Sequence, residues 1–60
     1  MIINNENIGD TIKITAGKYT GRIGTLVNYE YISDLNTYHI IIDSDNEEID
    51  IYNDNDFIFV

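Results

Sequence analysis

Alternation of apolar and polar residues is the clearest pattern in the chain, and it predicts β-strands. Residues 11–15 read Thr-Ile-Lys-Ile-Thr, which places both isoleucines on one side of a strand and the polar side chains on the other. Residues 48–52 read Glu-Ile-Asp-Ile-Tyr and alternate in the same way. The second segment therefore predicts a strand that points Glu48, Asp50 and Tyr52 outward and its two isoleucines inward.

Three further segments are rich in β-branched and aromatic residues and complete a five-strand prediction. They span residues 22–32, 38–43 and 57–60, and they are separated by polar turns at 16–21, 33–37, 44–47 and 53–56. The apolar positions of the longest segment do not alternate strictly, so we expect a bulge or a close backbone approach at Gly24. No segment shows the 3.6-residue period of a helix, and the fold class is therefore all-β.

Length and composition limit the chain to one small domain. A chain of sixty residues without cysteine has no disulfide to stabilise it, so its stability must come from an apolar core or from oligomerisation. Thirteen isoleucines and seven aromatic residues can supply that core. Residues 1–8 are mostly polar and predict an N-terminal arm against a sheet edge, followed by the folded domain at 9–60. No signal peptide and no long apolar span occur, so we expect a cytoplasmic protein without membrane contact.

The stretch from Gly9 to Asn28 resembles the hairpin of the KOW motif. The resemblance rests on a Gly-Asp entry, two short strands and spaced glycines, namely Gly9, Asp10, Ile12, Ile14, Gly17, Gly21, Gly24 and Leu26. It implies a small five-stranded SH3-like (KOW-type) barrel, in which Asp10 caps a turn. It also implies a place in RNA, ribosome or transcription machinery, with Lys18, Tyr19 and Arg22 at loop positions that can face phosphates.

Charge is distributed very unevenly between the two halves of the chain. Three cations face two carboxylates up to Asn28, whereas nine carboxylates and no Lys or Arg follow from Tyr29 onward, and the net charge is −8. Three cations offer too few phosphate contacts for useful affinity at physiological salt, so direct nucleic-acid binding is disfavoured. We expect instead an acidic partner-binding face made of Asp43, Asp45, Glu47, Glu48, Asp50, Tyr52, Asp54 and Asp56.

This face suggests a protein-binding module that docks on a basic, nucleic-acid-binding protein. Rows of carboxylates on a rigid sheet can imitate phosphates, as would suit a phage-type inhibitor of host nucleic-acid machinery. Three alternatives stay open: a KOW module that binds RNA, an assembly subunit that forms homo-oligomers through an edge strand, and an acidic surface kept for solubility. Tyr29, Tyr31, Tyr38 and Tyr52 are candidate interface anchors that could equally pack on the barrel.

Catalytic, cofactor and metal signatures are missing from the sequence. His39 is the single histidine and has no cysteine or nucleophile motif to accompany it, and no glycine-rich phosphate loop precedes a helix. Residues 43–47 resemble the opening of a calcium loop, but Glu48 stands where such a loop needs glycine, which favours a hairpin turn. We therefore expect no enzyme activity, no cofactor and no metal.

Overall fold

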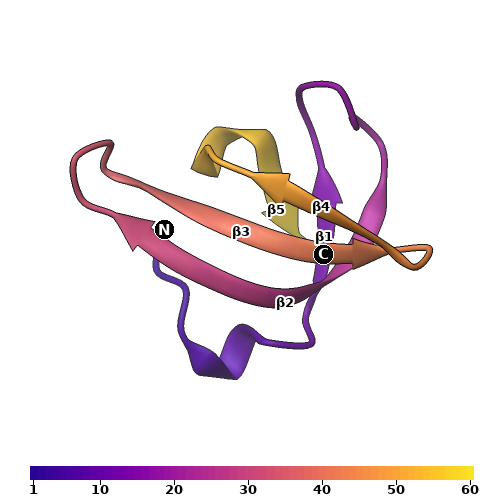
Figure 1. The fold of residues 1–60 in the computed structure, drawn as a ribbon, viewed down its shortest axis with the longest axis horizontal. Helices are drawn as coiled ribbons and strands as arrows, with labels where there is room; N and C mark the ends of the chain where they lie inside the picture. Colours follow the sequence, from indigo (N-terminus) through magenta and orange to yellow (C-terminus); the bar gives the residue numbers. More distant parts are fainter.

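Five antiparallel strands form one sheet in the order β4-β3-β2-β1-β5. The computed structural model describes residues 1–60 (Figure 1). The elements are η1 (Asn5–Asn7), β1 (Thr11–Ile14), β2 (Ile23–Ile32), β3 (Thr37–Ser44), β4 (Glu47–Ile51), η2 (Asp54–Asp56) and β5 (Phe57–Phe59). The two helices are single 3₁₀ turns, and neither has the length or the hydrophobicity needed to traverse a membrane. The predicted strands are confirmed to within one residue at most ends.

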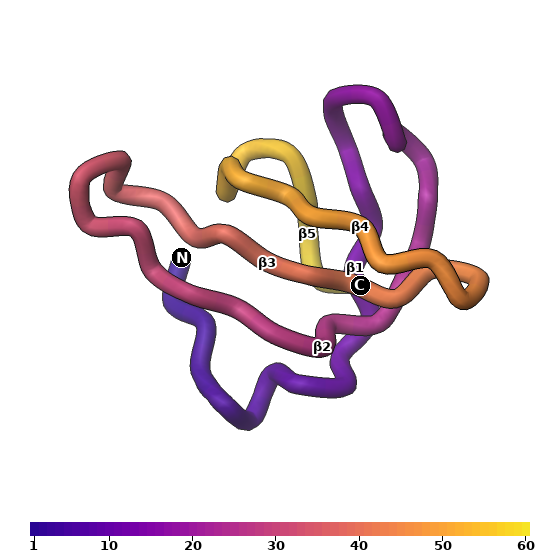
Figure 2. Tube along the Cα trace, viewed as in Figure 1, coloured from indigo at the N-terminus to yellow at the C-terminus, as the bar shows by residue number.

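The sheet is strongly curved because β2 pairs with different partners along its length. Its first residues pair with β1, and the rest of the strand runs beside β3. β1 in turn pairs with β5, which brings the end of the chain behind the β3–β4 hairpin (Figures 1 and 2). This arrangement is the SH3-like barrel that the sequence predicts.

A β-bulge at Val27 reverses which side chains of β2 face the core. Leu26 pairs with Ile42 and Asn28 pairs with Ile41, so Val27 has no partner on β3. Before the bulge the even-numbered residues point inward, and after it the odd-numbered Tyr29 does. The predicted bulge thus exists, but it lies three residues beyond Gly24, where the close backbone approach occurs instead.

Ten buried side chains make up the core between the two halves of the curved sheet. They are Ile3, Ile12, Ile14, Leu26, Tyr38, Ile40, Ile42, Ile49, Ile51 and Phe57. Six of them are isoleucines on strands, which fit a pleated buried surface well because they are branched at Cβ. The predicted inward positions of β1 and β4 are confirmed.

The N-terminal arm packs on the barrel without adding a strand to the sheet. Ile3 is buried in the core, and its carbonyl accepts a 3.4 Å hydrogen bond from the Tyr38 hydroxyl. Asn4 caps η1, and the side chain of Asn5 accepts a 2.8 Å hydrogen bond from the Tyr29 hydroxyl. The arm was expected at a sheet edge, and the structure corrects this: it covers the end of the core beside β2 and β3.

Candidate functional site

Four exposed carboxylates project from the outer side of three neighbouring strands. Glu30 belongs to β2, Asp43 to β3, and Glu48 and Asp50 to β4. The strand register places Asp43 directly opposite Glu48 and places Asp50 opposite Ile41. We call these four residues the acidic face. No Lys or Arg forms an ion pair with any of them.

The geometry of the strands spaces these charges regularly. Residues two apart on one strand face lie about 6.6 Å apart, and neighbouring strands lie about 4.8 Å apart. Like charges placed directly opposite on adjacent strands repel, so we expect the Asp43–Glu48 pair to cost the fold some stability. A cation supplied by a partner would remove this repulsion.

His39 lies on the same side of the sheet and contacts two of the four carboxylates. Its Nδ1 is 3.2 Å from Glu30 Oε1, and its Nε2 is 2.9 Å from Asp50 Oδ1. Burial of the ring, the largest single effect, disfavours its charge, but hydrogen bonds and attraction from Asp50 and Glu30 together outweigh it. The pKa of His39 is consequently raised above its ordinary value of 6.5.

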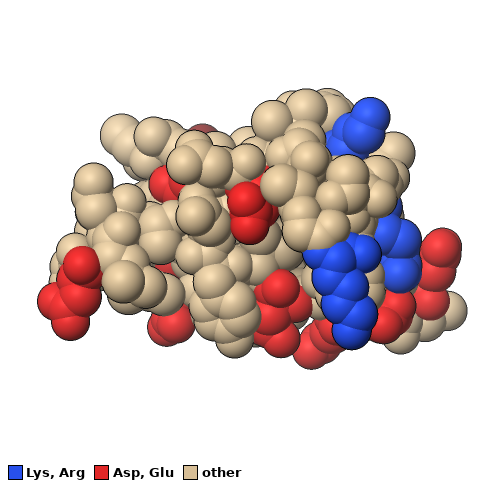
Figure 3. Space-filling model, turned by 90° about the horizontal axis from the view of Figure 1, so that it is seen from above, with Lys and Arg blue, Asp and Glu red and all other residues tan.

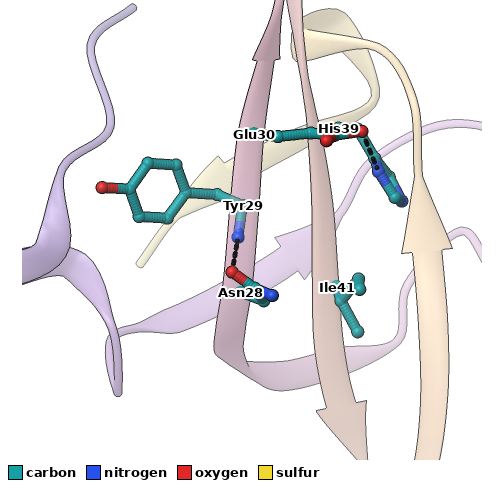
Figure 4. Close-up of a pocket in the computed structure, with 5 residues that line it drawn as sticks. All are labelled: Asn28, Tyr29, Glu30, His39 and Ile41. Atoms are coloured by element: carbon teal, nitrogen blue, oxygen red, sulfur yellow. Dashed lines mark hydrogen bonds and ion pairs between the residues drawn. The ribbon is translucent and has the colours of Figure 1, made fainter.

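A shallow hollow of about 110 Å³ opens beside the imidazole. Its lining includes Glu30, His39 and Ile41, which point to the same side of the sheet, whereas the Tyr29 ring points to the other side (Figure 4). The volume corresponds to about three or four water molecules at roughly 30 Å³ each, or to the end group of one side chain. The hollow is therefore too small to enclose an organic cofactor.

The remaining predicted acidic residues lie away from the acidic face or have structural partners. Asp54 Oδ1 accepts a 2.8 Å hydrogen bond from the Tyr38 backbone N–H, which anchors η2 to β3. Glu47 pairs with Arg22 at 3.1 Å, and Asp56 lies in η2, where its carbonyl accepts from the backbone of the loop after β1. Asp45 is one of two central residues of the β3–β4 turn. The turn has positive φ at both, as a two-residue hairpin requires, and the predicted hairpin turn is confirmed.

The four tyrosines that are candidate interface anchors divide into a packed pair and an exposed pair. Tyr38 is buried, and the Tyr29 ring packs against the core. Tyr31 and Tyr52 are 51% and 59% exposed. Tyr52 also stacks on His39, with ring centroids 4.2 Å apart and planes 6° apart. Tyr52 is therefore the aromatic residue that borders the acidic face.

Lys18, Tyr19 and Arg22, the alternative nucleic-acid patch, do gather at one end of the barrel. Lys18 Nζ lies 5.3 Å and Arg22 Cζ lies 5.8 Å from the centre of the Tyr19 ring. Arg22, however, is held in the fold: its guanidinium donates to the Ser44 hydroxyl and carbonyl and to Glu47. Figure 3 shows blue Lys and Arg surfaces only toward the right, with red Asp and Glu surfaces spread along the lower edge.

The outer side of the β5–β1–β2 half carries a different surface. Lys13 pairs in register with Ile23 and with Ile58, and both isoleucines are about half exposed. This side is apolar around one cation, whereas the β2–β3–β4 side carries four carboxylates. The two halves of the sheet therefore present chemically distinct surfaces.

The fold defines the class of the protein, a small SH3-like barrel. Residues 8–31 match the family model of the KOW motif, which confirms over this segment the resemblance seen in the sequence. The matched segment covers β1, the following loop and nearly all of β2. Modules of this kind often occur in RNA- and ribosome-related proteins. A comparison with curated proteins and one with solved structures each found no match.

The sequence analysis did not include Glu30 in the acidic face, and it did not predict that His39 would contact two of its carboxylates. The bulge at Val27 turns Glu30 to the outer side of the sheet, where it lies opposite His39 in the register. The alternation of Tyr29, Glu30 and Tyr31 could have indicated this orientation. The displaced bulge hid it, because the orientation of every residue after a bulge depends on where the extra residue stands.

Proposed function

We propose that this KOW module is a non-enzymatic protein-binding domain whose acidic face docks on a basic segment of a nucleic-acid-binding protein. The observation that carries the proposal is the set of four exposed carboxylates on one side of β2, β3 and β4, without any Lys or Arg paired to them. Clustered charges of one sign on a rigid surface attract an oppositely charged partner and speed its association.

Surface chemistry supports a partner that ordinarily binds phosphates. Carboxylates held a few ångströms apart in two dimensions offer a lysine- or arginine-rich site the same charge and acceptor atoms as a nucleic-acid backbone. Exposed Tyr52 at the border adds an aromatic surface on which an arginine can stack. An inhibitor that blocks a nucleic-acid site, such as a phage-type inhibitor, would need these properties.

The second candidate is an RNA-binding KOW module that uses Lys18, Tyr19 and Arg22. Their convergence around the Tyr19 ring favours it. The engagement of Arg22 with Ser44 and Glu47 argues against it, because few cations then remain free for phosphates. Direct RNA binding is therefore the weaker candidate, and an assembly role through the edge strands β4 and β5 has no specific observation in its favour.

Affinity capture with a matched pair of variants tests the proposal. The variant D43N/E48Q removes two charges of the acidic face, whereas E6Q/D34N removes two exposed charges from η1 and the β2–β3 turn. We expect the wild type and E6Q/D34N to capture the same basic protein from a lysate, and D43N/E48Q to lose it. The purified partner should then be displaced by duplex DNA or RNA.

Salt dependence provides the second criterion, because about 1 M salt reduces the screening length to roughly 3 Å. Capture that survives such salt, or that is equal for both variants, would overturn the proposal. Retention of RNA by the wild type and its loss on replacing Lys18 by alanine would favour the second candidate instead.

A further inference from the structure

His39 holds the central position among the charges of the acidic face. Glu30 approaches its Nδ1 from β2 at 3.2 Å, and Asp50 approaches its Nε2 from β4 at 2.9 Å. A neutral imidazole has one N–H and can donate to only one of these carboxylates, whereas the doubly protonated ring can donate to both. The geometry is thus that of an imidazolium ion held between two carboxylates.

Every titratable group that faces the ring favours this charged state. Glu30 faces it from β2 and Asp50 from β4, and the Tyr52 ring stacks on its face directly after β4. The only Lys or Arg ion pair of the chain joins Arg22 to Glu47, away from these groups. His39, when protonated, is therefore the one internal cation that pairs with Glu30 and Asp50.

Both carboxylates also belong to the surface on which a basic segment would dock. Their side chains are 67% and 50% exposed, so an incoming cation can reach them. The imidazole is only 15% exposed and lies between them. An incoming lysine or arginine would thus approach carboxylates whose negative charge the protonated His39 already reduces.

We propose that His39 regulates docking on the acidic face: its protonated ring competes with a basic segment for Glu30 and Asp50, and docking releases the proton. This inference rests on the proposed function, since it concerns the same carboxylates and the same basic partner. Deprotonated His39 leaves the two carboxylates available, whereas protonated His39 places a positive charge where the partner's cation has to approach.

Linkage fixes the sign of the effect. If protonation of His39 weakens docking, docking must lower the pKa of His39 by a matching amount. Unit charges about 4 Å apart in a largely aqueous setting interact weakly, which corresponds to roughly a threefold to tenfold change in affinity. The raised pKa of His39 in the free protein means that part of the population is protonated near neutral pH, where a partner would meet it.

Titration with a short arginine peptide tests this proposal, because arginine stays charged throughout the range and cannot itself cause a pH effect. The dissociation constant is measured at about pH 5.5 and about pH 8, on either side of the ordinary histidine value near 6.5. We expect the wild type to bind roughly threefold to tenfold more weakly at the lower pH. H39F keeps a ring for Tyr52 to stack on but cannot titrate, so the difference between the two pH values should shrink in this variant.

A measurement on the wild type makes the test independent of how the variants fold. His39 is the only histidine, so its imidazole proton signals in NMR spectra report its titration directly. We expect saturating peptide to lower the pKa of His39, and H39Q serves as a second non-titrating variant.

The possible outcomes separate the two proposals. A pH-dependent affinity in the wild type that is reduced in H39F and H39Q, together with a lowered His39 pKa, supports both. Peptide binding that depends on Asp43 and Glu48 but leaves the His39 titration unchanged overturns the regulatory role and leaves the docking proposal standing. No binding at either pH, or binding that D43N/E48Q does not weaken, overturns both.

Discussion

The α-carbon of Gly24 on β2 lies against the Asp43 carbonyl of β3. A Cβ atom built at Gly24 would lie 2.7 Å from that oxygen and 2.9 Å from Ile42 Cδ1. The Ile42 methyl is the end of a side chain and can shift, but the closer atom cannot, because it belongs to the backbone of the neighbouring strand. Glycine is therefore required at this position by the close approach of the two strands. The backbone conformation does not require it, because φ of Gly24 is not positive.

The variant G24A should destabilise the barrel. Overpacking of a close contact typically costs about 1–3 kcal/mol, because strands or side chains must shift to relieve it. Urea unfolding measures the loss, and T25A, which removes an exposed side chain from the adjacent position, is the control. An unchanged free energy of unfolding for G24A would mean that β2 and β3 are farther apart at this point than the structure has them.

Sequence patterns predicted the barrel well because its strands carry their own signals. Ile12 and Ile14 alternate with polar neighbours, as do Ile49 and Ile51, and both strands lie where the alternation places them. The position of the bulge could not be predicted in the same way. Whether the extra residue stands at Gly24 or at Val27 depends on the pairing with β3, which is a property of the folded sheet.

Arg22 should prove a structural residue more than a ligand-binding one. Its guanidinium bridges the start of β2 to the end of β3 through two hydrogen bonds to Ser44, and the Ser44 hydroxyl donates in turn to the Ile23 carbonyl at 2.8 Å. Hydrogen bonds of charged groups contribute about 1.5–3 kcal/mol, so R22A should lower the free energy of unfolding by about that amount.

The matched control for R22A is K18A, since Lys18 is exposed and its ammonium lies near the Tyr19 ring without an ion pair. Thermal unfolding of both variants distinguishes the two roles. Equal and small losses for R22A and K18A would contradict the structural role and would return Arg22 to the list of candidate phosphate-binding residues.

Neutralising the opposed carboxylates Asp43 and Glu48 should stabilise the isolated protein. Like charges opposite each other on adjacent strands cost roughly 0.2–1 kcal/mol, and salt screens this repulsion. The melting temperature of the wild type should therefore rise with added salt, and D43N/E48Q should start higher and respond less. E6Q/D34N is the control for loss of net charge alone. A melting temperature of the wild type that does not change with salt would show that the carboxylates repel each other too weakly to matter.

Only part of the candidate site could be predicted from sequence, for a related physical reason. Glu48 and Asp50 follow from strand alternation, and the structure places them as predicted. Asp54 looked equivalent in charge, yet its carboxylate accepts a backbone hydrogen bond from β3. A strand pattern gives the side to which a residue points, but it does not reveal which loop carboxylates will serve as caps and anchors.

The contribution of His39 to stability should depend on pH in a defined direction. Burial opposes protonation, but Asp50 and Glu30 raise the pKa of the folded state above the ordinary value of 6.5. A group whose pKa is higher in the folded than in the unfolded state stabilises the fold fully below the unfolded value, and this stabilisation is lost as the pH rises through the folded value. The free energy of unfolding of the wild type should thus fall relative to that of H39F as the pH rises from below 6.5 through the raised pKa of His39. Urea unfolding of both proteins across this range measures the difference between their free energies of unfolding. The titration of the carboxylates is common to both proteins and cancels in this difference to first order. A difference that stays constant, or that grows in favour of the wild type with rising pH, would mean that Glu30 and Asp50 do not hold an imidazolium between them in solution.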